Sequence, residues 1–285
     1  MKIFLGTFVL SLFFLAFSFG ETDTSQNSQK ELDQLRKEYL ADKAALDQIN
    51  ETKEKIREKN KDQKIPNSGP EWKKALKEWV PLWQKAEASY PKYLNALVRS
   101  YCELPQTDKK TRELKKEIEQ QHPEHSKNSL TVSYYETHSL LANAIMPHLY
   151  SQSLEKERAD FFVKLLKPNF NTKMEDFLHF LKLPGEPDDW SVQTGYSLAN
   201  LRAGNFSTAR KENKKLIKKA SKFDKITELK QLHLHRALIE AHDGKENEAR
   251  NFLDKALEMN SPAALDPNSQ KLVKETKLAL AKLKK

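Results

Sequence analysis

The chain has 285 residues, of which 49 are basic and 40 acidic, so its formal net charge is +9, and only 38% of the residues are apolar. This composition excludes a polytopic membrane protein, because each membrane-spanning helix needs about 20 consecutive, mostly apolar residues. The seven glycines form no G-x-G pair, so glycine-rich nucleotide-binding loops of the P-loop and Rossmann kinds are also excluded. Lys, Glu, Leu and Ala outnumber the β-branched residues, and this balance predicts an all-α fold.

The first twenty residues have the pattern of a secretory signal peptide. A basic start is followed by an apolar run over 3–17, and small residues stand at Ser18 and Gly20. We expect cleavage after Gly20, with cleavage after Ser18 as the alternative, and no transmembrane segment in the mature chain. An uncleaved anchor is the other interpretation, because the run is at the lower limit of a membrane-spanning length.

Cysteine usage indicates the compartment. Cys102 is the single cysteine, and an exported chain without an internal disulfide is typical of the bacterial periplasm rather than of eukaryotic secretion. We therefore expect the protein in the periplasm or elsewhere in the bacterial cell envelope. Export separates it from nucleic acid, so no nucleic-acid partner is expected.

The region 21–64 is expected to form a long, solvated, coiled-coil-like helix. Over 31–64 the apolar residues recur at alternating steps of three and four, with Asp42 and Lys53 interrupting the stripe. This stripe could pair with a partner helix or fold back on the body of the protein. A linker over 65–70 contains two prolines and a glycine, and it predicts a domain boundary.

A helical domain is expected over 71–188. Trp72, Trp79 and Trp83 share one face of a helix that Pro81 should kink. The tryptophans could form a sugar-stacking platform, but packing is the preferred interpretation, since aromatic side chains dominate burial. Short connections are typical of antiparallel helical hairpins. Further helices are expected at 91–103, 107–121, 130–152, 154–167 and 172–181.

Within 189–285, two segments align with each other at a spacing of 40 residues. Small residues at matching offsets would let two helices approach closely, and a glycine would close the first helix in a left-handed conformation. The aligned pairs are Ser197 with Ala237, Gly204 with Gly244, and Ala209 with Ala249.

This pattern resembles the tetratricopeptide repeat family, in a degenerate form that is confined to the C-terminal third of the chain. The second copy is the better match, whereas the first has Asn213 at a position for a large apolar residue. The spacing also exceeds the usual repeat of about 34 residues. An apolar stripe from Leu272 to Leu283 is similar to the capping helix that ends such arrays.

The resemblance implies a groove that binds a partner protein through the first helix of each pair. This lining is largely apolar, which suits an amphipathic partner segment or the chain's own helix at 31–64. The residues implied are Thr194, Leu198, Leu201, Leu234, Leu238 and Ala241.

Positive charge is concentrated in 204–222, which carries a net charge of +6. Basic residues at steps of about four would line one helical face. Such a face attracts anionic phospholipid, acidic polymer or an acidic protein, although a merely solvated face has the same pattern. The basic residues are Arg210, Lys211, Lys214, Lys215, Lys218, Lys219 and Lys222.

No motif indicates catalysis, and we expect neither a cofactor nor a metal. His233, His235 and His242 lie in one predicted helix, but no His-Glu-x-x-His motif accompanies them. The leading hypothesis is a non-enzymatic interaction or scaffold protein of the bacterial envelope. The alternative is an adaptor that docks on an anionic envelope surface through the basic face, and a third possibility is an enzyme with an unrecognised site in 71–188.

Overall fold

The computed structural model describes residues 4–62, 67, 69–122, 134–167, 190–222, 225–259 and 266–283, with side chains from residue 27 in the first helix and from residue 137 in the fourth. All regular secondary structure in these ranges is helical, and no strand occurs in them. The all-α prediction is therefore confirmed. The chain divides into two compact units, Met1–Ser133 and Tyr134–Lys285.

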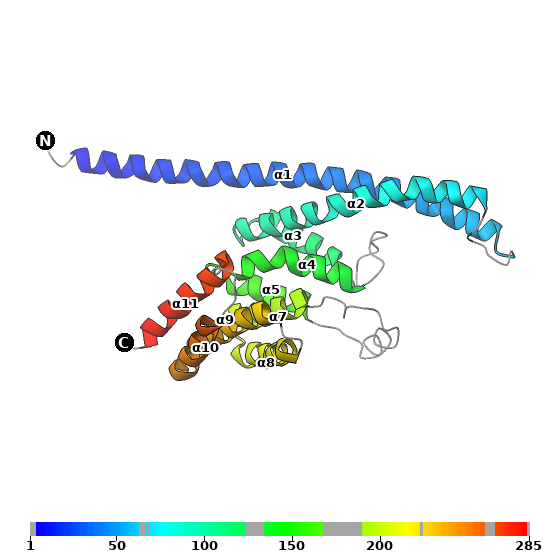
Figure 1. Ribbon diagram of the computed structural model, residues 1–285. Helices are drawn as coiled ribbons and strands as arrows, with labels where there is room; N and C mark the ends of the chain where they lie inside the picture. The colour runs from blue at the N-terminus through cyan, green and yellow to red at the C-terminus, as the bar shows by residue number, and fades with distance from the viewer. Residues whose placement is uncertain are drawn as a thin grey trace. The chain divides into compact units, whose positions relative to one another are not determined.

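The first unit contains α1 (Phe4–Lys59), α2 (Pro70–Glu103) and α3 (Lys109–Gln121). α2 lies along α1 and also packs on α3 (Figure 1). The apolar stripe of α1 faces α2, where Tyr39 stacks on Tyr93 with their ring centroids 5.0 Å apart. A helix of the same chain thus covers the stripe that was predicted over 31–64.

The two charged residues that interrupt this stripe have partners in α2. Asp42 is buried, and its Oδ1 lies 2.9 Å from Nζ of Lys85. The Nζ of Lys53 lies 4.1 Å from the ring centroid of Trp79, which is a cation–π contact. Trp79 also donates its indole N–H to Asn50 Oδ1 at 2.9 Å. These contacts support the packing interpretation for Trp79.

α2 runs through both of its internal prolines, Pro81 and Pro91, whereas the sequence predicts a separate helix from 91 onward. Each proline removes one backbone N–H and therefore one helical hydrogen bond. The buried side chains of Ala86, Tyr90 and Leu94 lie around these prolines. Their burial stabilises the continuous helix against that loss.

The second unit has its helices packed around α7 and α9. α7 packs on α4, α5 and α8, while α9 packs on α8, α10 and α11. The buried residues of α7 and α9 therefore form much of the core of this unit. The helices are α4 (Tyr134–Leu149), α5 (Lys156–Leu166), α7 (Trp190–Arg202), α8 (Phe206–Lys222), α9 (Ile226–His242), α10 (Glu246–Glu258) and α11 (Pro267–Leu283).

Gly204 and Gly244 follow α7 and α9 in equivalent turns. Their φ angles are +81° and +77°, in the left-handed region that the sequence predicts. The N–H of the residue after each glycine bonds the carbonyl five positions earlier, at 2.8 Å in both turns. The two predicted glycine turns are confirmed, and they share one geometry.

The aligned small residues lie where helices approach one another. Ser197, Ala209, Ala237 and Ala249 have no exposed surface, and Ser197 Oγ donates to the carbonyl oxygen of Ala209 at 3.1 Å. Asn213 is also buried, and its Nδ2 donates to a carbonyl of α9 at 3.0 Å. A polar residue can occupy this position because a backbone acceptor is available to it.

The boundary between the two compact units lies between Ser133 and Tyr134, whereas the sequence predicts boundaries at 65–70 and after 188. The linker at 65–70 joins two helices that pack on each other, and the predicted start of a domain at 189 falls inside the second unit. α4 and α5 belong with α7 because their apolar faces are buried against it. The predicted helix at 172–181 and the side chains of the predicted signal peptide lie outside the described residues.

Candidate partner-binding cleft

The residues predicted to line a partner groove lie mostly in the interior. Thr194 is half-buried, but the other five are buried almost completely by neighbouring helices. Their side chains therefore form core, and this corrects their assignment as an open lining. The five buried residues are Leu198, Leu201, Leu234, Leu238 and Ala241.

A cleft of about 150 Å³ opens beside Thr194, between α4, α7 and α9. On α7 and α9 it lies about one helical turn before the predicted residues, and α4 adds a wall that the sequence did not indicate. Its lining combines apolar and polar side chains, which is typical of sites that bind a ligand in a defined orientation. The lining residues are Met146, Trp190, Ser191, Thr194, Glu228, Gln231 and Leu232.

Trp190 forms the apolar end of the cleft. It packs against the core residues Leu216 and Leu232, so the ring has a fixed position. Its indole nitrogen Nε1 is buried and has no hydrogen-bond partner among the described residues. A buried N–H without an acceptor is unfavourable by roughly 1–3 kcal/mol.

Two lysines lie near the Trp190 ring. The ammonium groups of Lys219 and Lys225 lie 5.6 and 5.1 Å from the ring centroid, within cation–π range. Among the described residues that line the cleft, Glu228 is the one acidic side chain. This end of the cleft therefore presents an aromatic face and positive charge together.

The polar wall is fixed by hydrogen bonds beneath the lining. Ser191 Oγ lies 3.0 Å from Ser139 Oγ, and Gln231 donates its side-chain N–H to the hydroxyl of Tyr150 at 2.8 Å. The same hydroxyl lies 3.3 Å from Nε2 of His235. The bond to Tyr150 fixes the orientation of the Gln231 side chain, because it engages the amide nitrogen.

Tyr150 and His235 remain neutral at physiological pH. Burial is the main reason that the pKa of the Tyr150 hydroxyl is raised, and a nearby Asp266 carboxylate adds to it. Burial also lowers the pKa of His235 to about 3, helped by the positive charge of Arg202. The hydrogen-bonded pair beneath Gln231 is therefore uncharged.

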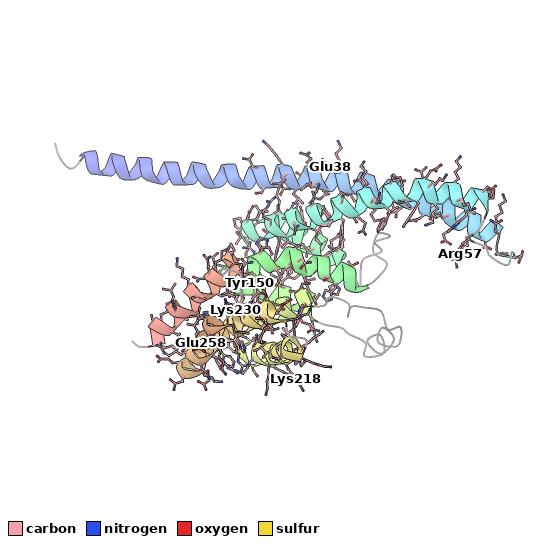
Figure 2. All side chains as sticks on the ribbon, viewed as in Figure 1. Glu38, Arg57, Tyr150, Lys218, Lys230 and Glu258 are labelled. Carbon is pink, nitrogen blue, oxygen red and sulfur yellow. The ribbon has the colours of Figure 1, made fainter. Side chains whose placement is uncertain are left out.

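The predicted basic face is only partly free. Lys211, Lys214, Lys215 and Lys218 are exposed on α8, and Lys218 lies at the outer edge of the helix (Figure 2). The opposite face of α8 is buried, so the predicted amphipathic pattern is confirmed. Lys222 is exposed as well.

Lys215 and Arg210 of this set form ion pairs within the chain. Lys215 Nζ lies 2.9 Å from Glu212 Oε1 on α8 itself, whereas Arg210 is bound to α9. Its guanidinium donates to the buried carboxylate of Glu240, with Nη2 to Oε2 at 2.8 Å, and also to Asp243. Arg236 holds the same Glu240 carboxylate from its own helix. Arg210 thus fastens α8 to α9 and is not available to an external anion.

The three histidines of α9 have separate surroundings. His233 stacks on Phe252, His235 is buried, and His242 Nε2 lies 3.1 Å from Glu275 Oε1. Within the described part of the chain, no three His, Cys, Asp or Glu side chains are grouped so that they could hold a metal ion.

Sequence reasoning missed most of the cleft. Met146, Ser191 and Gln231 carry no motif, and they come together only because three helices meet. Trp190, at the start of a predicted helix, was the one available signal, since an isolated tryptophan beside polar residues is common in binding sites.

Comparisons with protein-family models, curated proteins and solved structures found no match to this chain. Among the described residues, no helix has the length and apolar character that crossing a bilayer requires.

Proposed function

We propose that this protein is a non-enzymatic interaction protein of the bacterial envelope, and that its second unit binds a segment of a partner protein in the cleft between α4, α7 and α9. The observation that carries this proposal is the cleft itself, whose apolar end at Trp190 and polar wall at Ser191 and Gln231 are held in place by contacts beneath the lining. The expectation of export rests on the N-terminal residues 1–20 alone.

The proposed repeat relationship supports a binding role for this cleft. α7 and α9 each lead into an equivalent glycine turn, and they correspond to the first helices of the two aligned copies. In tetratricopeptide arrays the first helices line the ligand groove, and α7 and α9 would contribute to such a groove through the residues of the cleft. α4 and α5 would supply a preceding pair, which a stable array of at least three units needs.

The cleft suits a short stretch of partner chain. About 150 Å³ accommodates one or two side chains, and the polar lining would align the backbone beside them. The preferred occupant would place an apolar group against Met146 and the Trp190 ring and a polar group beside Ser191 and Gln231.

An affinity capture from envelope extract tests this function. The exported form expected, residues 21–285, would be compared with Thr194→Arg, in which a long charged side chain fills the cleft. The matched control is Asn251→Arg, because Asn251 is exposed on α10 and does not line the cleft.

A partner retained by the parent and by Asn251→Arg, but reduced at least about ten-fold with Thr194→Arg, would support the proposal; that reduction equals about 1.4 kcal/mol. Equal capture by all three forms would remove the cleft from the function. The interaction could then be measured by calorimetry with a peptide of the captured partner.

The exposed lysines of α8 favour a second candidate function, docking on an anionic envelope surface. Vesicle sedimentation with anionic lipid should show binding that is lost when four α8 lysines become Glu. A variant with four α11 lysines changed to Glu has the same net charge, so it separates this face from charge in general. The α8 set is Lys211, Lys214, Lys215 and Lys218, and the α11 set is Lys271, Lys274, Lys277 and Lys282.

A further inference from the structure

An apolar stripe on α2 remains uncovered in the first unit. Leu76 and Val80 are 40% and 39% exposed, and Trp72 and Trp83 are half-buried beside them. Because these four residues follow one another at steps of three and four, they share one side of the helix. We call Trp72, Leu76, Val80 and Trp83 the α2 stripe.

The α2 stripe is held on a preformed support. Trp79 lies next to it, stacked on Trp83 with the ring centroids 5.6 Å apart. Two residues of α1 also contact Trp79: Lys53 lies over its ring, and Asn50 accepts its N–H. The exposed side chains therefore project from a fixed helix pair, and presenting them to a ligand requires no refolding.

Lysines lie on both sides of the α2 stripe. Lys53 of α1 reaches it on one side, with Nζ 5.6 Å from the ring centroid of Trp72. On the other side, Lys73 and Lys77 are exposed, and each follows a stripe residue by one position, about 100° around the helix. A stripe of apolar side chains is thus bordered by positive charge.

Glu71 and Glu78 lie off the stripe, whereas Glu87, four positions after Trp83, lies on the same side of the helix one turn beyond it. Glu78 follows Leu76 by two positions, which places it about 200° around the helix. Glu71 is engaged by Lys59, with Nζ to Oε1 at 3.1 Å. Between Trp72 and Trp83, the stripe and its borders are therefore apolar and cationic.

We propose that the α2 stripe docks in the interfacial region of an anionic phospholipid bilayer, with its apolar side chains at the boundary of the acyl chains and its bordering lysines at the lipid phosphates. Tryptophan is enriched at this depth of a membrane. Helices that combine an apolar face containing tryptophan with lysines on the polar face bind there. This surface is separate from both the cleft and α8, so the proposal is independent of those in the second unit.

The charges also argue against a second copy of the chain as the occupant. A symmetric dimer contact places the same patch on both subunits. Such a contact would bring two patches together that are each bordered by lysines, and like charges would oppose it. Anionic lipid phosphates complement the same lysines.

Vesicle sedimentation tests the proposal. The exported form, residues 21–285, would be mixed with vesicles of phosphatidylcholine and phosphatidylglycerol, or of phosphatidylcholine alone. The variant Leu76→Ser/Val80→Ser should bind the anionic vesicles at least about ten-fold more weakly, because two exposed apolar side chains are removed from the contact. Replacing Lys73 and Lys77 by Gln should weaken binding about five-fold for each lysine.

Two controls make the assignment specific. Leu257→Ser/Leu278→Ser removes two similarly exposed leucines from the second unit and should leave vesicle binding unchanged. The variant with four α8 lysines changed to Glu should still bind the anionic vesicles, and adding Leu76→Ser/Val80→Ser to it should weaken that binding further. In a Trp190→Phe background, brominated lipid should quench the fluorescence of the α2 tryptophans.

Equal vesicle binding by the parent and by Leu76→Ser/Val80→Ser would overturn the proposal, as would an absence of quenching. Analytical ultracentrifugation gives one more decisive outcome. If the stripe variant changes the oligomeric state and the parent does not bind vesicles, the face is a contact between copies of the chain, and the lipid proposal is wrong.

Discussion

Arg202 in α7 and Glu275 in α11 form an ion pair that is almost completely buried. Their side chains are 6% and 8% exposed, and Nη2 of Arg202 donates to Oε2 of Glu275 at 2.8 Å. Arg202 also donates its Nε–H to the carbonyl oxygen of Leu149. The pair joins α7 to α11, and its two residues are 73 positions apart in the sequence.

Replacing Glu275 with Gln should lower the free energy of unfolding by about 3 kcal/mol, because it leaves the Arg202 guanidinium buried without a counter-charge. Denaturant unfolding followed by circular dichroism would measure the change. Glu258→Gln is the matched control, since Glu258 is exposed on α10, and it should alter stability by less than about 0.5 kcal/mol. An equally small effect at both sites would contradict a stabilising role for the pair.

The same carboxylate predicts a loss of stability in acid. Burial by itself would raise the pKa of Glu275, but hydrogen bonds from His242 and Arg202 outweigh it and lower the pKa to about 2. The unfolded carboxylate, with a pKa near 4.5, binds its proton first as the pH falls. About 3 kcal/mol of stability, present above pH 4.5, should therefore disappear between about pH 4.5 and 2. In Glu275→Gln this step should be absent.

The buried imidazole of His235 predicts a second loss of stability, which begins at a higher pH than the loss caused by Glu275. Its pKa is lowered to about 3 by burial and by Arg202, whereas an unfolded histidine has a pKa near 6.5. Between these two pKa values, the histidine is protonated in the unfolded state and neutral in the folded state. The free energy of unfolding should therefore fall by about 1.4 kcal/mol for each unit that the pH is lowered between about pH 6 and 4. In His235→Gln, the slope of unfolding free energy against pH should be smaller by about 1.4 kcal/mol per pH unit, which corresponds to one proton. An unchanged slope would show that His235 is protonated in the folded protein.

The two glycine turns should contribute equally and independently to the free energy of unfolding. Gly204 and Gly244 have positive φ angles, and a Cβ added to either would meet no atom within 4 Å. Gly→Ala at each site should therefore lower the free energy of unfolding by about 1–2 kcal/mol through backbone strain alone. Gly→Asn should lower it less, since Asn tolerates this conformation better. Equal losses for Ala and Asn would argue against backbone strain as the cause.

In the first unit, Glu117 accepts hydrogen bonds from both Arg36 and Tyr93, with Tyr93 Oη to Oε1 at 2.7 Å. Glu117→Gln should lower the stability of this unit by about 2 kcal/mol, because it weakens both bonds and removes the ion pair in a partly buried site. Fluorescence of the α2 tryptophans, with Trp190 replaced by Phe, would follow this unit alone. Glu119→Gln is an exposed control on the same helix, and it should unfold as the parent does.

Much of the local structure could be predicted from the sequence. The small residues at 197 and 237 and the glycines at 204 and 244 have the environments that their spacing predicts, because helix contacts and left-handed turns restrict which residues fit. The amphipathic pattern of α8 likewise follows from its periodicity. These features depend on side-chain size and on positions within one or two turns.

The tertiary structure decided which of these surfaces remain accessible. Leu198 and Leu234 have the periodicity of a groove lining, but neighbouring helices bury them. Arg210 looks like part of a cationic face until Glu240, thirty positions later, neutralises it. In each case the partner lies far away along the chain, where periodicity carries no information.

The sequence by itself therefore determined that the described chain is helical, the apolar faces of α1 and α8, and the glycine turns after α7 and α9. Only the tertiary structure decided that the stripe of α1 is covered by α2, and that Met146, Trp190 and Gln231 meet in one cleft. The physical reason is that helix formation and capping depend on nearby residues, whereas burial and ion pairing depend on which helix packs against which.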